Sequence, residues 1–250
     1  MASLADVSND RAVGPPPALL QIAALTKCYA GQPVLSQVSF DVHAGELLGL
    51  IGPNGAGKTT LLETIAGLLP ADAGEILWRG SPVPISQRRK TIFYLPDGLR
   101  PWDDQYVLQV LEFFAAVYGR KEDALSGTIH AVDLASVLNK RVASLSKGFA
   151  RRLMIALAFL TPHPLLLMDE PFDGFDLRQT REVMTLLRQA AKDGRTLVLA
   201  IHQLADAERI CDRLVLLAGG TIRGVGTLDA LRAEVQRPSA GLEEIFLALT

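Results

Sequence analysis

A glycine-rich turn between an apolar run and a helical run constrains this chain more than any other feature of its sequence. ELLGLIG, residues 46–52, leads directly into GPNGAGKTT, and TTLLETIAGLL then continues with helical spacing. Gly52, Gly57, Lys58 and Thr59 match the pattern GxxxxGK[ST], in which glycines let backbone N–H groups point at phosphates. Strand, turn and helix in this order predict a phosphate loop within an α/β fold. An ordinary glycine turn is the alternative, which the flanking strand and helix disfavour.

The phosphate loop also predicts a nucleotide and its metal ion. The Lys58 ammonium is positioned to reach the β and γ oxygens of a nucleoside triphosphate, and the Thr59 hydroxyl is positioned to ligate Mg²⁺. The other expected nucleotide contacts in this loop are Asn54, Gly55, Ala56, Gly57 and Thr60.

A second apolar strand, LLLMDE at residues 165–170, ends in two carboxylates. We expect Asp169 to bind the magnesium ion and Glu170 to orient or deprotonate the water that attacks the γ-phosphate. Taken alone, the pair could instead mark the start of a helix. A phosphate loop in the same chain favours the catalytic interpretation.

His202 ends a third apolar strand, TLVLAIH. A histidine after a buried strand is often structural. However, the strands that end near Gly52, Glu170 and His202 would meet along one edge of a parallel sheet, where α/β folds bind their ligands. We therefore predict that His202 hydrogen-bonds the γ-phosphate.

The segment LSKGFARRLMIALAFL, residues 145–160, predicts a second anion site far from the phosphate loop. Ser146 stands at the N-cap position of a long helix, and the free N–H groups of its first turn attract anions. One phosphate loop cannot use a site on a distant subdomain unless another molecule brings it. Two copies facing each other would place Ser146 and Gly148 of one copy on the γ-phosphate held by the other.

Composition and charge limit the remaining possibilities. The net charge is −2, from 25 basic and 27 acidic residues, so no global field favours a nucleic-acid partner. No apolar run approaches the ~20 residues that span a bilayer. Cys28 and Cys211 form no CxxC pair, which fits reduced cysteines and a cytoplasmic location. We expect a loose tail at residues 1–17 and one domain at 18–250, with helices from about 100 to 162.

Several motifs occur in a familiar order: GPNGAGKT, LSKGF, LLLMDEP, DGFD at 173–176, and His202. Over residues 19–226, approximately, the chain closely resembles the ATP-binding subunits of ABC transporters. The resemblance implies a P-loop NTPase core of ABC type, an antiparallel β portion, an inserted helical subdomain, and ATP with Mg²⁺. It implies that Tyr29 stacks on adenine, although a lone tyrosine near a turn could equally pack in the core. It also implies that DGFD crosses a dimer seam.

Four positions depart from the family pattern. Asp97, in YLPD, stands where the family usually has the glutamine that links metal and attacking water to the helical subdomain. We expect Asp97 to contact the metal, directly or through a water; a turn carboxylate beside Gly98 is the alternative. Lys147 and Phe149 replace the third and the last residue of LSGGQ, and Gln203 follows the histidine where an acidic residue is frequent.

The resemblance implies a cytoplasmic ATPase that forms a homodimer around ATP. It would act on the cytoplasmic face of the membrane and power transport through separate transmembrane permease subunits. The YLP segment and the short cassette are slightly more similar to exporters than to importers. A soluble ABC-type ATPase acting on DNA, ribosomes or metal clusters is the alternative, but its usual coiled coil, second cassette or cysteine-rich domain is absent from this sequence. A kinase or GTPase would leave LSKGF and His202 unexplained.

Overall fold

A six-stranded sheet carries the ends of the three expected motif strands. The computed structural model describes residues 18–250, so the expected tail at residues 1–17 lies outside the described residues. The strand order is β10-β9-β3-β8-β7-β6, and every neighbouring pair is parallel except the β9–β10 hairpin. Its strands are β3 Leu47–Ile51, β6 Ile92–Leu95, β7 Leu165–Asp169, β8 Thr196–Ile201, β9 Arg213–Ala218 and β10 Thr221–Gly226. The parallel arrangement predicted for the motif strands is therefore confirmed.

A second, antiparallel sheet has the order β2-β1-β4-β5. Its strands are β1 Ala18–Tyr29, β2 Gln32–His43, β4 Ala73–Trp78 and β5 Ser81–Pro82. β1 and β2 pair with each other in antiparallel orientation. They meet at a two-residue turn in which Ala30 and Gly31 have φ values of +47° and +78°, the conformation that suits a tight hairpin.

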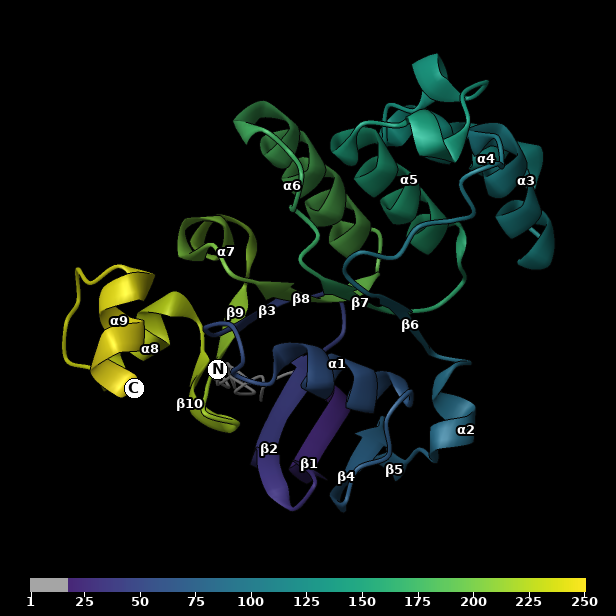
Figure 1. The fold of residues 1–250 in the computed structure, drawn as a ribbon. Coiled ribbons are helices and arrows are strands. Elements are labelled where there is room, and N and C mark those ends of the chain that lie inside the picture. The colour runs from purple at the N-terminus through teal and green to yellow at the C-terminus, as the bar shows by residue number, and fades with distance from the viewer. Residues whose placement is uncertain (1–17) are drawn as a thin grey trace, which may run out of the picture.

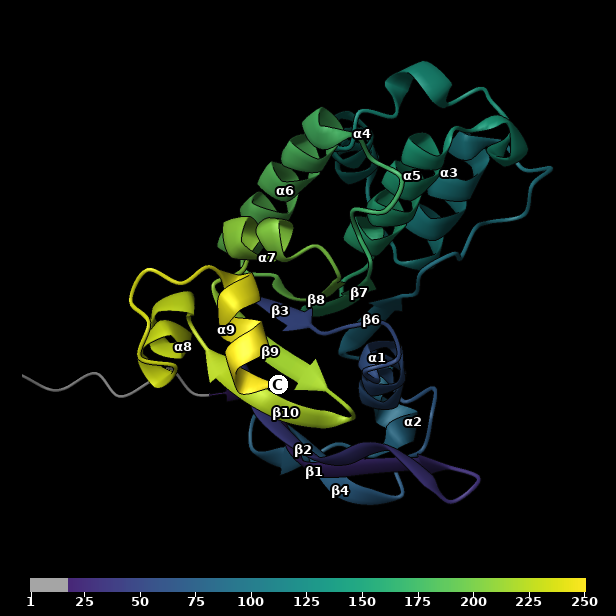
Figure 2. The same cartoon turned by 60° about the vertical axis from the view of Figure 1, so that its left-hand side comes forward.

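The central sheet is buried on both faces, which explains its nearly continuous apolar strands. Successive side chains of a strand point to opposite faces, so β7 sends Leu165 and Leu167 to one side and Leu166 and Met168 to the other. The first face packs on α1, Lys58–Ala66, and on the antiparallel sheet. Figures 1 and 2 show α1 between the two sheets and the larger helices beyond the opposite face.

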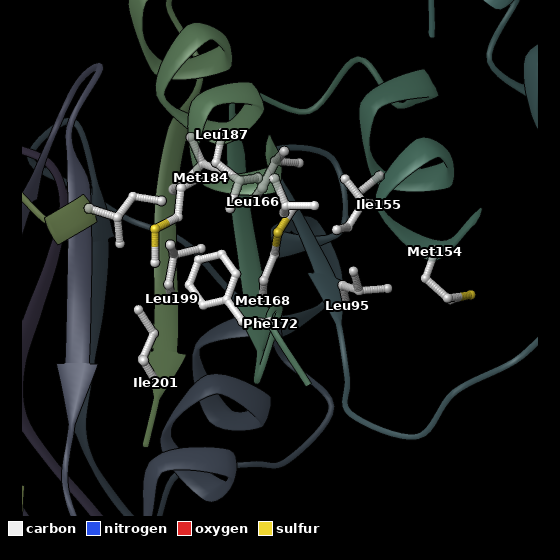
Figure 3. Close-up of a cluster of buried hydrophobic side chains, with 14 of the residues drawn as sticks. Leu95, Met154, Ile155, Leu166, Met168, Phe172, Met184, Leu187, Leu199 and Ile201 are labelled. Carbon is white, nitrogen blue, oxygen red and sulfur yellow. The ribbon is translucent and has the colours of Figure 1, made fainter. Parts of the chain in front are cut away.

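The chain between β6 and β7 forms helices, as the predicted fold class requires. These are α3 Val107–Val117, α4 Glu122–Ala131 and α5 Lys147–Leu160, with single 3₁₀ turns at Ala135–Val137 and Val142–Ser144. Buried side chains of α5 and α6, Leu177–Lys192, meet β6, β7 and β8 in one cluster (Figure 3), labelled by Leu95, Ile155, Leu166, Met184 and Leu199. This cluster connects the helical portion to the sheet that carries the motif ends. The exact limits, 100 and 162, stay a prediction.

The remaining helices are short. They are α2 Ile85–Arg88, α7 Leu204–Ile210, α8 Leu228–Glu234 and α9 Leu242–Leu249. No helix within residues 18–250 combines the length and the apolar character needed to cross a membrane.

Candidate nucleotide-binding site

The phosphate loop connects the end of β3 to the start of α1, as predicted. Glycine is required at two of its positions. Gly57, at the N-cap of α1, has a φ of +103°, and a Cβ there would lie 2.9 Å from the Leu35 side chain. A Cβ on Gly52 would lie 2.2 Å from the backbone oxygen of Leu217. The loop thus lies directly against the hairpins β1–β2 and β9–β10.

Lys58 is the first residue of α1, and its side chain is buried. Its Nζ donates to the backbone oxygens of Gly52 and Pro53, at 2.8 and 3.3 Å. The loop therefore holds the ammonium group over its own concave side, where the β- and γ-phosphates are expected. A bound phosphate would find this charge already in position.

Thr59 and Asp169 meet across the gap between α1 and β7. The Thr59 hydroxyl donates to Asp169 Oδ2 at 2.6 Å. Burial raises the pKa of Asp169, the Thr59 hydrogen bond lowers it in part, and the nearby Asp97 charge raises it further. A neighbouring cation would stabilise the charged form of this buried carboxylate.

These two oxygen ligands fit a magnesium ion. Mg²⁺ prefers one or two protein oxygens together with phosphate oxygens and waters rather than a cage of side chains. Residues 18–250 contain no group of three or more His, Cys, Asp or Glu side chains arranged to hold a metal alone. Thr59 and Asp169 alone would not complete the coordination of Mg²⁺. The phosphates of a nucleotide, together with waters, would supply the remaining ligands.

Glu170 and His202 follow adjacent strands and contact each other, as their strand-end positions predict. His202 Nδ1 lies 2.5 Å from Glu170 Oε2, and the Glu170 N–H donates to the backbone oxygen of Ala200. Glu170 has a φ of +50°, a left-handed conformation that side chains other than glycine adopt at a cost. Such backbone strain is typical of residues whose side chain is aimed at a ligand.

A pocket of about 370 Å³ opens among these groups. Of the predicted site residues, it is lined by Asn54, Gly55, Gly57, Lys58, Thr59, Thr60, Asp97, Asp169 and Glu170. Ala56 is buried behind the loop, where its backbone oxygen accepts from the Gly220 N–H at 3.2 Å. His202 does not line the pocket but contacts Glu170, which does. One sheet edge thus brings together the phosphate loop, both carboxylates and the histidine.

Asp97 lines this pocket but also has a partner in the helical portion. Its carboxylate follows β6 and accepts a hydrogen bond from the guanidinium of Arg151 on α5. No hydrogen bond to Gly98 accompanies it among the contacts of residues 18–250. The metal contact expected of Asp97 stays a prediction.

Tyr29 is the last residue of β1 and does not line the pocket. The residue is 46% exposed, so it does not pack in the core. The Lys27 ammonium lies 5.5 Å from the ring centroid and 3.4 Å from Asp72 Oδ1, while Asp72 Oδ2 accepts from the Cys28 N–H at 2.6 Å. Asp72 therefore fixes the end of β1 beside the exposed Tyr29, and the stacking of Tyr29 on adenine stays a prediction.

The Ser146 segment forms the predicted helix start. Ser146 caps α5, its hydroxyl accepting from the Phe149 N–H at 3.3 Å, and Gly148 is buried against Phe175 and Gln179. Neither Ser146 nor Gly148 lines the pocket of its own chain. The contribution of Ser146 and Gly148 to a nucleotide held by another copy stays a prediction.

Two neighbours of Ser146 have partners within the chain. Phe149 is partly buried against the large apolar cluster. Lys147 forms an ion pair with Asp173 of the DGFD segment at 3.3 Å, and Asp176 of that segment caps α6.

Comparison with known proteins decides the family. Residues 35–173, more than half of the chain, match the family model described as ABC transporter. The chain belongs to the ABC transporter family. Together with its fold and motifs, this makes it a nucleotide-binding, ATP-hydrolysing member.

Individual ABC relatives agree. The ABC-type transporter ATP-binding protein EcsA of Bacillus subtilis is 32% identical over 238 residues, spanning 93% of this chain and 96% of EcsA. Nod factor export ATP-binding protein I of Rhizobium etli is 39% identical over 209 residues, spanning 80% of this chain and 66% of that protein. A solved ATP-binding subunit of an ABC transporter has a TM-score of 0.85 and 32% identity, over 92% of this chain and 99% of that one.

Three residues near this ABC site escaped the sequence analysis. Val34 lines the pocket, Arg151 pairs with Asp97, and Tyr94 lies close enough to Asp169 that burial and this carboxylate raise the pKa of the phenol. Tyr94 lies between the apolar residues Phe93 and Leu95 of β6, and Arg151 lies within the helical run of α5. Neither had a motif that could have identified it.

Proposed function

We propose that two copies of this chain bind two ATP molecules between them and use hydrolysis to drive transport through separate membrane subunits. The observation that carries the proposal is the convergence of Lys58, Thr59, Asp169, Glu170 and His202 at one sheet edge, around the pocket. All five follow, or directly face, the ends of parallel strands, where α/β folds bind nucleotides.

Each side chain has a distinct task in this proposal. The phosphate-loop N–H groups and Lys58 hold the β- and γ-phosphates, and Tyr29 stacks on the adenine. Thr59 and Asp169 would hold Mg²⁺, with Asp97 completing the set through a water. When bound, the ion offsets the negative charge of the phosphates. Glu170 accepts the proton of the attacking water, and His202 orients Glu170 while donating to the γ-phosphate.

The second copy supplies Ser146 and Gly148. Their helix is 14 residues long, and its N-terminus carries a partial positive charge that suits a γ-phosphate. Since neither residue lines the pocket of its own chain, the shared site gives them a function. It also explains why ATP would hold the two copies together.

Membrane subunits are the proposed partners. Four large apolar side chains at or near the helical portion are more than half exposed: Leu99, Trp102, Phe113 and Val117. Such a surface suits an apolar segment of another protein. The name of the rhizobial relative, a Nod factor export protein, favours export. A chain that hydrolyses ATP for membrane subunits would act on the cytoplasmic face of the membrane. ATP-stimulated transport in vesicles containing the co-purified membrane protein tests this part of the proposal.

Ser146→Arg is expected to reduce hydrolysis at least tenfold while leaving ATP binding by the monomer unchanged. The arginine would occupy the place of the partner's γ-phosphate without touching the phosphate loop of its own chain. Ser146→Ala is the matched control, because it loses the same N-cap, at ~1 kcal/mol, without adding bulk. Steady-state ATPase rates and melting curves of both variants separate the two effects.

Mixing Ser146→Arg chains with Lys58→Ala chains is expected to restore activity. Each mixed dimer pairs the intact phosphate loop of the first chain with the intact Ser146 helix of the second, so one site works. Activity that stays at the level of the separate variants would contradict sites shared between chains.

A further inference from the structure

We propose that Arg151 is a positioning residue that ties the nucleotide pocket to the helix carrying Ser146, by holding Asp97. The inference rests on the shared site of the proposed function. Its basis is the ion pair between the Arg151 guanidinium and Asp97 Oδ1. This pair joins the segment after β6 to α5, two parts of the chain that are 54 residues apart in sequence.

The two partners differ in a way that suits this role. The Arg151 side chain is only 8% exposed, and Asp97 is its one hydrogen-bond partner within residues 18–250. The Asp97 side chain is 50% exposed, and it lines two pockets. The first is the nucleotide pocket, and the second, of about 230 Å³, is also lined by Lys147 and Arg151. Asp97 therefore faces the expected phosphates and the start of α5 at once.

Electrostatics explain why Asp97 needs this partner. Three carboxylates, of Asp97, Asp169 and Glu170, line the nucleotide pocket, where Lys58 is the only basic side chain in the lining. Like charges in one site repel, and ATP would add several more negative charges. The Arg151 guanidinium offsets the Asp97 charge and leaves Asp97 Oδ2 available to a metal-bound water.

The position of Arg151 on α5 places its ion pair with Asp97 close to the N-terminus of that helix. Arg151 lies about one turn after Lys147, where α5 begins, so the side chain acts close to the Ser146 N-cap. A change in the position of Asp97 when ATP binds would thus reach the anion-binding end of α5 through a single ion pair. Arg151 would couple ATP binding in one site to the closing of the site in the partner.

Arg152 provides a matched control on the same helix. It is equally buried, but it donates to the Val132 backbone oxygen at 3.0 Å and to Glu182 at 2.7 Å, away from the nucleotide pocket. Replacing either arginine removes a buried guanidinium. Only the Arg151 variant removes the contact with Asp97.

The test is dimerisation with Mg-ATP in the hydrolysis-deficient Glu170→Gln chain. Adding Arg151→Met, or Asp97→Asn, is expected to raise the ATP concentration for half-maximal dimerisation at least tenfold. The ATP affinity of the Arg151→Met monomer, measured by calorimetry at low protein concentration, should change less than twofold, because Arg151 does not line the nucleotide pocket. The double variant should be no worse than Asp97→Asn alone, because the Arg151 side chain then has no charged partner left to lose. Arg151→Lys, which keeps the charge, should recover part of the effect.

The control variant Arg152→Met is expected to lower the melting temperature while dimerising at the ATP concentration of the Glu170→Gln parent. If Arg151→Met and Asp97→Asn dimerise at that same concentration, the ion pair between Arg151 and Asp97 only stabilises the fold and the inference is overturned. The proposed site shared between two copies would not be affected by that result. Because Asp97 is half-exposed, Asp97→Asn is expected to fold even where Arg151→Met does not, and its dimerisation at the parent's ATP concentration would overturn the inference on its own. A parent that stays monomeric with Mg-ATP instead overturns the proposed function, and the inference with it.

Discussion

Glu170→Gln is expected to slow ATP hydrolysis by about 10²- to 10⁴-fold while two copies stay together around Mg-ATP. Glutamine keeps the length and shape of the side chain but cannot accept a proton from the attacking water. It can still hydrogen-bond to His202 Nδ1, which lies 2.5 Å from Glu170 Oε2, so the geometry around the γ-phosphate is preserved. ATP therefore binds without turning over. Steady-state phosphate release and sizing chromatography with Mg-ATP measure the two effects.

Glu75→Gln is the matched control for this prediction. Glu75 lies on β4, is exposed, and forms no ion pair within residues 18–250. It should hydrolyse ATP at the unaltered rate and show no stable dimer. A Glu170→Gln chain that remains monomeric and hydrolyses ATP normally would show that Glu170 is not the base.

The strand ends could be predicted from sequence because each motif directly follows its strand. β3 leads into the phosphate loop, β7 into Asp169 and Glu170, and β8 into His202. Parallel pairing then brings these ends to one edge, with no further information needed. The same reasoning predicted the cap of α5 at Ser146, since capping depends on local chemistry.

Contacts between distant side chains could not be predicted in this way. The pair of Asp97 with Arg151 depends on how the helical portion packs on the sheet, and no local pattern encodes that packing. The same holds for Asp173 of the DGFD segment, which binds Lys147, and for Val34, which reaches the pocket because β2 lies beside the loop. The prediction that DGFD crosses a dimer seam remains open to the mixing experiments.

Tertiary contacts give Lys58 a structural role in addition to its expected contact with the phosphates. A side chain that faces only the ligand could be removed with little effect on folding. In the structure, however, Lys58 Nζ donates to the backbone oxygens of Gly52 and Pro53. Its removal should therefore cost some stability as well as affinity.

Lys58→Ala is expected to weaken ATP binding by on the order of 10²-fold or more. Hydrogen bonds to charged groups contribute about 1.5–3 kcal/mol each, and this ammonium is expected to contact both the β- and the γ-phosphate. The free energy of unfolding should fall by only about 1 kcal/mol, because the Gly52 and Pro53 oxygens become accessible to water in the open pocket. For a chain of this size that is a decrease of roughly 2–4 °C in melting temperature. Calorimetric titration with ATP and melting curves without nucleotide measure the two quantities.

Two further variants separate the charge of Lys58 from its packing. Lys58→Met keeps most of the buried apolar stem, so it should bind ATP as weakly as Lys58→Ala and melt closer to the unaltered chain. Lys90→Ala removes an exposed lysine outside the pocket and should change neither quantity.

ATP should also raise the melting temperature of the unaltered chain and fail to do so for both Lys58 variants, because only a ligand that binds the folded state stabilises it. ATP affinity that is unchanged in Lys58→Met would mean that the loop binds phosphate through its N–H groups alone, and the role assigned to the Lys58 charge would be wrong.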